Sequence, residues 1–249
     1  MALKTDKNSY TIVFAVIMVV VVGTILAYAA DSLKGRITEN KRIEKQQNIL
    51  YAMGINENDE RSAIFVSKAE VGNKFTKYIT KQLVIQGDQV TENAEAYLID
   101  IKKEQAAAKD KSYQRRLPLF IGENEGNTFY IAPIRGKGLW DAIWAYVAMD
   151  KDMIVQGIFL DHKGETPGLG ANINQRFFMD DFTGEHLMDD NTFQGISVAK
   201  GNGDPKNNNK TDFKIDAIAG STITGDGVSA MIKNDLVHYV PYFKTLKNN

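Results

Sequence analysis

The chain has 249 residues, and its 30 Lys and Arg residues nearly balance its 31 Asp and Glu residues, which gives a formal net charge of −1. This balance excludes the basic surface on which nucleic-acid binding depends, so we expect no nucleic-acid partner. The absence of cysteine excludes disulfides and an iron–sulfur cluster held by thiolates. The histidines lie far apart, without the spacing of metal ligands, and we predict no metal site.

The first predicted element is a membrane-spanning helix. Residues 10–30 carry no charged side chain, and a helix of this length would extend about 31 Å, close to the hydrocarbon thickness of a bilayer. A buried core helix rarely runs this far without a polar face. The sequence Ala27-Tyr28-Ala29 has the form of a signal-peptide cleavage site, but the apolar run is longer than that of most signal peptides. We therefore predict an N-terminal tail over residues 1–9 and an uncleaved anchor over residues 10–30.

Basic residues flank this anchor on both sides. Two precede it and five follow it closely: Lys4 and Lys7, then Lys34, Arg36, Lys41, Arg42 and Lys45. A positive-inside count would place the C-terminal side in the cytoplasm. Long domains can translocate regardless of flanking charge, so the residue pattern leaves the topology open.

The remaining chain is predicted to form a helical stalk followed by one domain. Apolar residues recur among charged ones over residues 31–55, which predicts the stalk, and the domain would occupy residues 56–249. Residues 60–116 are polar and mixed and predict little beyond a helix at 92–110. The later elements expected in chain order are a strand at 128–134, a hairpin of 140–149 with 153–160, a short helix at 174–182, a loop at 201–211, a strand at 213–218 and a helix at 224–239. This pattern predicts an α+β fold with antiparallel β-hairpins and flanking helices, carried on a single transmembrane helix.

The most informative stretch is residues 216–227, where glycines and hydroxyl residues gather before a predicted helix. Free backbone N–H groups and the helix dipole favour a phosphate at such a position, although the hydroxyls could equally cap the helix. Gly225, Gly227 and Ala230 imitate a dinucleotide fingerprint, but they lie inside the helix start rather than in a βαβ unit, so we reject that interpretation.

Two further stretches form tight turns. Residues 165–170 combine a carboxylate, a hydroxyl, a proline and two glycines, and residues 136–140 lead from a glycine turn into Trp140. Each could be an ordinary loop. Trp140 could stack on a planar ligand, but filling the core is the more common role of a single tryptophan.

Taken in order, these motifs resemble those of a known family. The matching segments are GKGLW at 136–140, HKGETPGLG at 162–170, Lys200 after a short strand, and DAIAGST at 216–222. They are similar to the FMN-binding domain of the C subunits of sodium-translocating NADH:quinone oxidoreductases, a domain shared with the G subunit of Rnf complexes. The resemblance implies an FMN-binding region at about 119–240, in an electron-carrier subunit of a complex that oxidises NADH, reduces quinone and pumps sodium. It also implies other subunits as partners, an inner-membrane location and a periplasmic domain.

The resemblance further implies the site. In the family, a flavin transferase esterifies the FMN phosphate to the last threonine of the motif, which is Thr222 here, and Asp216 is the motif's leading acid. Ala219 and Ser221 depart from the family pattern, so Ser221 and Thr224 are rival acceptors, although we expect Thr224 to cap the helix. The other expected cofactor-binding residues are Gly220, Leu139, Trp140, Glu165, Thr166, Gly168 and Leu169, with Lys200 near a flavin carbonyl or the phosphate. No catalytic nucleophile is expected.

Two other functions remain open at this point. The G subunit of an Rnf complex shares the flavin domain and the anchor, although the GKGLW segment and the longer chain favour the sodium-translocating NADH:quinone enzyme. A non-redox binding module on a membrane anchor, whose Thr/Gly motif merely caps a helix, belongs to a different class.

Overall fold

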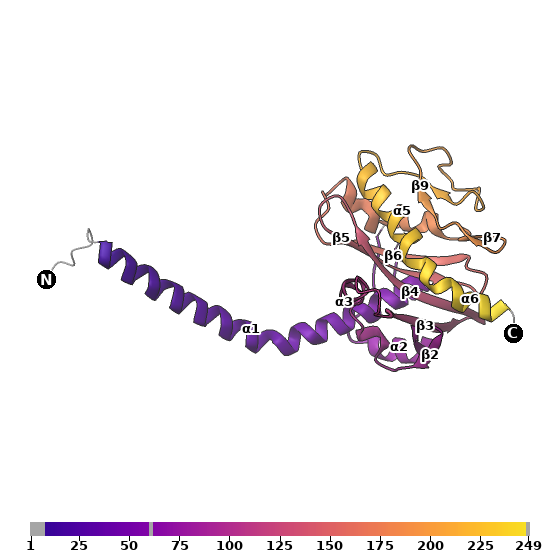
Figure 1. Ribbon diagram of the computed structural model, residues 1–249. Coiled ribbons are helices and arrows are strands. Elements are labelled where there is room, and N and C mark those ends of the chain that lie inside the picture. Colours follow the sequence, from indigo (N-terminus) through magenta and orange to yellow (C-terminus); the bar gives the residue numbers. More distant parts are fainter. Residues whose placement is uncertain (1–7, 60–61, 248–249) are drawn as a thin grey trace. The chain divides into compact units, whose positions relative to one another are not determined.

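The computed structural model describes residues 8–59 and 62–247, so most of the expected tail at 1–9 lies outside the described residues (Figure 1). It divides into two compact units with a boundary between Arg42 and Ile43. The α-helices are α1 (Asn8–Ala52), α2 (Val71–Tyr78), α3 (Ile101–Ala107), α4 (Arg176–Met179), α5 (Thr222–Leu236) and α6 (Val240–Lys247), with 3-10 turns η1 (Ala96–Leu98), η2 (Gly170–Asn174), η3 (Asp180–Phe182) and η4 (Val237–Tyr239). The strands are β1 (Ile79–Gln86), β2 (Gln89–Glu92), β3 (Arg116–Asn124), β4 (Asn127–Lys137), β5 (Ala142–Met149), β6 (Val155–His162), β7 (Met188–Asp189), β8 (Thr192–Phe193), β9 (Ser197–Val198) and β10 (Lys214–Ile215).

Helix α1 begins at Asn8, inside the expected tail, and continues without a break to Ala52. Its apolar N-terminal part is long enough to cross a membrane by length and composition, and none of the window that meets this test is buried. Large apolar side chains such as Val19, which is 71% exposed, face outward there, as lipid contact requires. The anchor and the stalk are therefore one continuous helix.

The last turns of α1 belong to the core of the second unit. Ile49 and Leu50 are fully buried, and Met53, just after the helix, is 2% exposed. The compact unit accordingly starts at Ile43 rather than at the expected residue 56. Of the apolar residues that suggested a stalk, Ile49, Leu50 and Met53 are part of the hydrophobic core, whereas Ile37 is exposed.

An antiparallel six-stranded sheet in the order β2-β1-β3-β4-β5-β6 forms the centre of this unit. The expected hairpin is present as β5 and β6, with Tyr146 opposite Phe159. The β1–β2 hairpin was not predicted, and its turn at Gly87 has a positive φ of 59°. The predicted helix at 92–110 is only partly correct: Glu92 ends β2, Ala96–Leu98 form the 3-10 turn η1, and the α-helix is limited to Ile101–Ala107.

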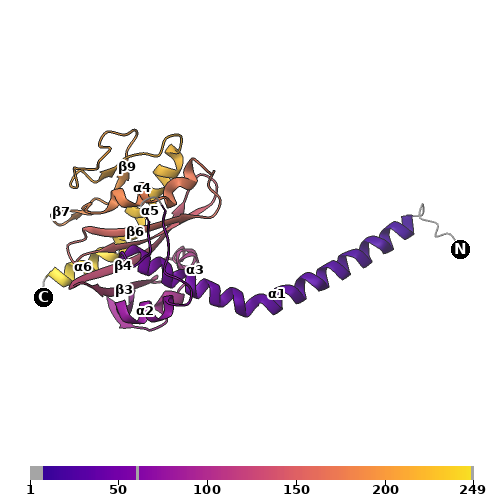
Figure 2. The same cartoon turned by 180° about the vertical axis from the view of Figure 1, so that it is seen from behind.

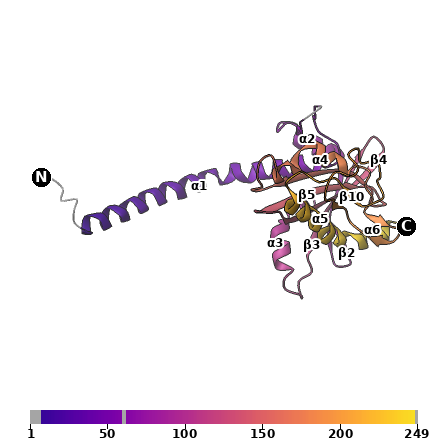
Figure 3. The same ribbon diagram turned by 90° about the horizontal axis from the view of Figure 1, so that it is seen from above.

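The two faces of the sheet are covered by different helices. Successive strand residues point to opposite faces. A Cβ at Gly157 would lie 2.4 Å from the carbonyl oxygen of Ala52, so the last turn of α1 crosses one face. A Cβ at Gly136 would lie 2.6 Å from Cβ of Met231, so α5 covers the other face. Figure 2 views the unit from the side of α1's last turns, and Figure 3 shows α5 and α6 on the opposite side of the sheet.

Polar contacts fix α5 and the following η4 turn against the sheet. Nη1 of Arg115, just before β3, pairs with Asp235 at 2.5 Å, and the buried Tyr239 hydroxyl donates to the backbone carbonyls of Pro118 and Pro133. Helix α5 begins at Thr222, two residues before the expected start, and the expected strand at 213–218 is only the short β10. The α+β fold class with antiparallel hairpins is confirmed.

Candidate functional site

A cavity of about 250 Å³ lies where three segments that are distant in the sequence meet. They are the turn after β4, the loop after β6 and the N-terminus of α5. The cavity is lined by Leu139, Glu165, Thr166, Leu169, Gly170, Gly220, Ser221, Thr222, Ile223 and Thr224. The structure thus brings together eight of the predicted site residues: Leu139, Glu165, Thr166, Leu169, Gly220, Ser221, Thr222 and Thr224.

Glu165 joins all three segments. Its side chain is buried, with 4% exposed. Oε1 accepts a hydrogen bond of 3.0 Å from the backbone N–H of Trp140, and Oε2 accepts one of 2.6 Å from the Thr224 hydroxyl. Burial alone would raise the pKa of Glu165, but the hydrogen bonds from Thr224 and from the backbone amides of Trp140, Asp141 and Leu139 outweigh it and lower the pKa. The carboxylate is therefore ionised at neutral pH and links the three segments through its hydrogen bonds.

Two glycines leave room for the Glu165 carboxylate and its hydrogen-bond partners. A Cβ at Gly138 would lie 2.5 Å from Oε1 of Glu165, and a Cβ at Gly170 would lie 2.5 Å from Oγ1 of Thr224. Any side chain at either position would push the carboxylate or its partner away. Neither glycine was among the predicted site residues, although both stand inside the quoted motifs.

The N-terminus of α5 forms one wall of the cavity. The first N–H groups of a helix have no partner within the helix and favour an anion. Ser221 is the N-cap residue, yet its side chain makes no capping bond; it is 7% exposed, and its Oγ has no hydrogen-bond partner in the described chain. Thr222 is exposed beside it. Thr224 does not cap the helix as expected, because its hydroxyl donates to Glu165 instead. An unpaired buried hydroxyl and free amides suit a phosphate.

Exposed apolar side chains at the cavity and next to it form an apolar rim. Leu139 and Leu169 are each 42% exposed, Ile223 is 58% exposed and Trp140 is 67% exposed. Trp140 lies in the turn before β5 rather than in the core, and its ring N–H donates to Oγ1 of Thr166 at 3.2 Å. Such a rim can cover the faces of a planar ring. Ile223 was missed in the sequence, where its only signal is an apolar residue next to Thr222.

Besides Trp140, which lies beside the cavity, three predicted residues do not line it. Gly168, with a φ of 77°, turns the loop that presents Leu169. Asp216 accepts hydrogen bonds from the backbone N–H groups of Gly203 at 2.9 Å and Asp204 at 3.3 Å, so it holds the preceding loop.

Lys200 is the third of them. It is exposed, and its neighbours Ala199 and Gly201 bond to the backbone of Ile215 and Ala217. It therefore lies beside the segment that leads to Thr222 rather than in the cavity.

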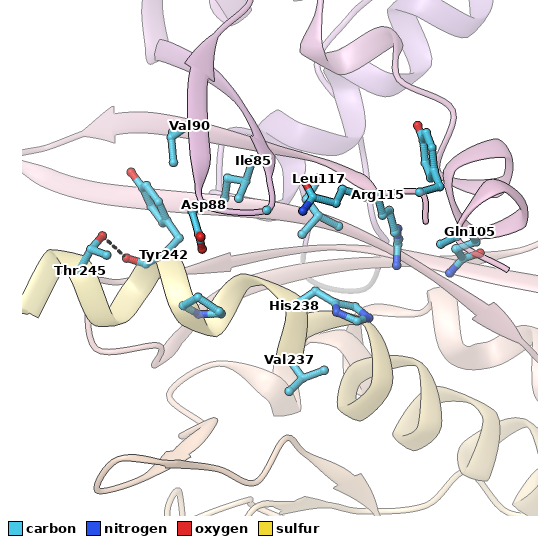
Figure 4. Close-up of a pocket in the computed structure, with 15 residues that line it drawn as sticks. Ile85, Asp88, Val90, Gln105, Arg115, Leu117, Val237, His238, Tyr242 and Thr245 are labelled. Atoms are coloured by element: carbon cyan, nitrogen blue, oxygen red, sulfur yellow. Dashed lines mark hydrogen bonds between the residues drawn. The ribbon is translucent and has the colours of Figure 1, made fainter. Parts of the chain in front are cut away.

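A larger cavity, of about 1000 Å³, lies elsewhere (Figure 4). It runs between the β1–β2 hairpin and the junction of α5 with α6, with Ile85 and Leu117 in its floor and His238 and Tyr242 on the helix side. None of the predicted site residues lines it. Volume alone therefore does not locate the site that the sequence motifs indicate.

The comparisons with known proteins cover the segments that line the smaller cavity. A family model described as FMN-binding domain matches residues 138–237, a range that includes every residue lining the smaller cavity. The C subunit of the Na(+)-translocating NADH-quinone reductase of Vibrio anguillarum is 30% identical over 92% of this chain and 90% of its own length. This chain belongs to that family of C subunits.

Other members show the same similarity. The C subunit from Neisseria meningitidis serogroup B is 28% identical over 100% of this chain and 98% of its own length. The crystal structure of the C subunit from Parabacteroides distasonis matches with a TM-score of 0.70 and 29% identity, over 85% of this chain and 96% of that one. The predicted family and its FMN-binding domain are confirmed, and the two alternative functions are not favoured.

Proposed function

We propose that this chain carries covalently bound FMN as the electron-carrier C subunit of a membrane complex that oxidises NADH, reduces quinone and pumps sodium. The family membership and the FMN-binding domain support this function. The single observation that supports placing FMN here is that Thr222, Ser221 and apolar side chains line the same cavity. FMN supplies the electron-transfer chemistry, and the chain's own residues bind, orient and shield it.

Thr222 is the residue that we propose to carry the FMN phosphoester. Its exposed hydroxyl stands at the first position of α5, where the helix amides and the unpaired Ser221 hydroxyl would hold the phosphate. The two rival acceptors are less suited: Ser221 Oγ is buried, and the Thr224 hydroxyl is already bonded to Glu165. The exposed position also leaves Thr222 accessible to a flavin transferase.

The apolar rim would hold the ring system of the flavin. Leu139, Leu169 and Ile223 offer aliphatic contacts at the cavity, and Trp140 offers an aromatic face beside Thr166. Other subunits of the complex would dock on this domain, and α1 would anchor it in the inner membrane with the second unit on the periplasmic side. The match of α1 to the length and composition of a membrane span supports the anchor.

A denaturing gel viewed under ultraviolet light tests the attachment. The wild-type chain, produced with its flavin transferase, should fluoresce, whereas Thr222→Ala should be folded, membrane-bound and dark. Ser221→Ala and Thr224→Ala are the matched controls and should keep the fluorescent band. A fluorescent Thr222→Ala band would overturn the assignment, and a dark wild-type band would overturn covalent attachment altogether.

Protease accessibility tests the orientation. Protease added to intact spheroplasts should remove the second unit, because we propose that it lies outside the cytoplasm. Protection in spheroplasts, with cleavage only in inverted vesicles, would place it on the cytoplasmic side.

A further inference from the structure

The FMN cavity contains a fixed negative charge. Both oxygens of Glu165 are satisfied, but every hydrogen-bond donor recorded for them is a neutral backbone N–H or hydroxyl group. No Lys or Arg lies within salt-bridge distance of this carboxylate among the residues that the structure describes. The nearby cation of Lys163 is paired with Asp141 at 2.8 Å instead. The hydrogen bonds thus keep Glu165 ionised without cancelling its charge.

This charge is shielded from water and faces the proposed cofactor site. Glu165 is 4% exposed, yet it lines the cavity together with Leu139, Leu169 and Thr222. Solvent and salt screen a buried charge much less than an exposed one. A group that gains charge in this cavity would therefore experience the field of Glu165 strongly.

We infer that Glu165 is a positioning residue whose fixed negative charge lowers the reduction potential of the flavin held in this cavity. The inference rests on the proposed function, because it requires FMN at this site. Reduction moves an electron from an external donor onto the ring, and no bond of the protein forms or breaks. The added negative charge would lie near an ionised carboxylate, which costs free energy and favours the oxidised ring.

The same carboxylate also has a structural role, because its hydrogen bonds hold three segments together. Removing its hydrogen bonds would let the turn at 138–141 and the N-terminus of α5 move apart, since Glu165 links them. A purely structural role predicts loosened flavin binding, whereas the electrostatic role predicts a shift of potential in one direction. The midpoint potential separates the two.

The experiment is a spectroelectrochemical titration of the purified full-length holoprotein. Glu165→Gln removes the charge but keeps the shape and one acceptor oxygen, and its midpoint potential should be higher than that of wild type. Asp141→Asn is the matched control: it removes one negative charge from an exposed neighbouring carboxylate that is already paired with Lys163, so its shift should be much smaller. An unchanged or lower potential for Glu165→Gln, or an equal shift in the two variants, would overturn the inference.

A second variant covers the case in which Glu165→Gln does not fold or load flavin. Thr224→Val removes one donor from the carboxylate but leaves the charge, so a proton can bind to Glu165 more easily when the ring is reduced. Its midpoint potential should depend more steeply on pH than that of wild type in the acidic range. An identical pH dependence would contradict the inference. Absence of ultraviolet fluorescence in the wild-type band would instead identify a failure of the proposed function.

Discussion

Two buried glutamates in the same unit behave in opposite ways. Glu165, at the cavity, is 4% exposed, and hydrogen bonds overcome burial and lower its pKa. Glu185, in the loop between η3 and β7, is fully buried, and both of its side-chain oxygens lack a hydrogen-bond partner within the described residues. Burial raises the pKa of Glu185 to about 7, and the nearby Asn207 amide and Lys210 cation only partly offset this effect.

The difference shows that burial alone does not decide the charge of a carboxylate. Directed N–H and O–H groups can replace the lost hydration of an ion, whereas a site without them favours the neutral acid. Glu165 is therefore a permanent charge at neutral pH, and Glu185 is a group that titrates there. Ionisation of Glu165 should consequently stabilise the folded state, whereas ionisation of Glu185 should destabilise it.

The largest expected loss of stability comes from a side chain that would collide with Glu165 and Thr224. In Gly170→Val the new Cβ would lie 2.5 Å from Oγ1 of Thr224 and 2.7 Å from Oε2 of Glu165. Overpacking of a tight buried site typically costs about 3 kcal/mol, so the free energy of unfolding should fall by this order and covalent flavin should be lost. Gly164→Ala is the control, because its Cβ would meet Asp141 at an ordinary 3.8 Å. Equal stability of the two variants in urea unfolding would contradict the tight packing described above.

The next effect tests Glu185 through pH. Its pKa is 4.5 as an ordinary side chain and about 7 in the fold, so the folded state binds the extra proton and is stabilised below pH 4.5. This stability is lost as the pH rises to about 7, by about 3 kcal/mol over the window. Glu185→Gln should remove this fall and be more stable than wild type at pH 8. Urea unfolding at pH 5 and pH 8 measures it, and a variant that is less stable than wild type at pH 8 would show that the ionised form is well accommodated.

The same substitution at Glu165 should act in the opposite direction. Its lowered pKa means that the carboxylate stabilises the fold above pH 4.5, and that this contribution is lost as the pH falls through the folded-state value. Glu165→Gln should lower the free energy of unfolding at pH 7 by about 2 kcal/mol, since charge-assisted hydrogen bonds are lost and a donor faces Thr224. A neutral or stabilising result would mean that the four donors do not favour the ion.

Several residues of the candidate site could be named from the sequence because its motifs are local and similar to those of a known family. Leu139, Leu169 and Thr222 were proposed as neighbours from three separated stretches, and the structure brings them to one cavity. The α+β class and the β5–β6 hairpin also followed from alternation and a polar turn. Apolar residues near residue 50 were misread as a stalk, because periodicity shows an apolar face without showing what covers it.

Long-range pairing is what the sequence could not provide. The bond from Thr224 to Glu165 joins residues 59 positions apart, and no local signal distinguishes it from the helix cap that was expected. Glu185 stands in a Gly-Glu-His turn that resembles a solvated loop, yet β6 and the loop at 201–211 enclose it completely. Both cases depend on which distant segments pack together, a property of the tertiary fold rather than of any window of residues.

The smallest expected effect is that of the Lys210 charge on the pKa of Glu185. Lys210 places Nζ 3.8 Å from Oε1 of Glu185, and its charge opposes the rise of that pKa. Lys210→Met keeps the aliphatic stem that packs near Gly184 but removes the cation. The pKa of Glu185 should then move further upward, so the pH window over which stability falls should extend to higher pH. The change in unfolding free energy at pH 8 should be about 0.5 kcal/mol, because the pair is long and partly exposed. Lys206→Met, an exposed site on the same loop, is the control and should leave the pH profile unchanged. A window that shifts downward in Lys210→Met, or shifts equally in both variants, would show that Lys210 does not act on Glu185 through its charge.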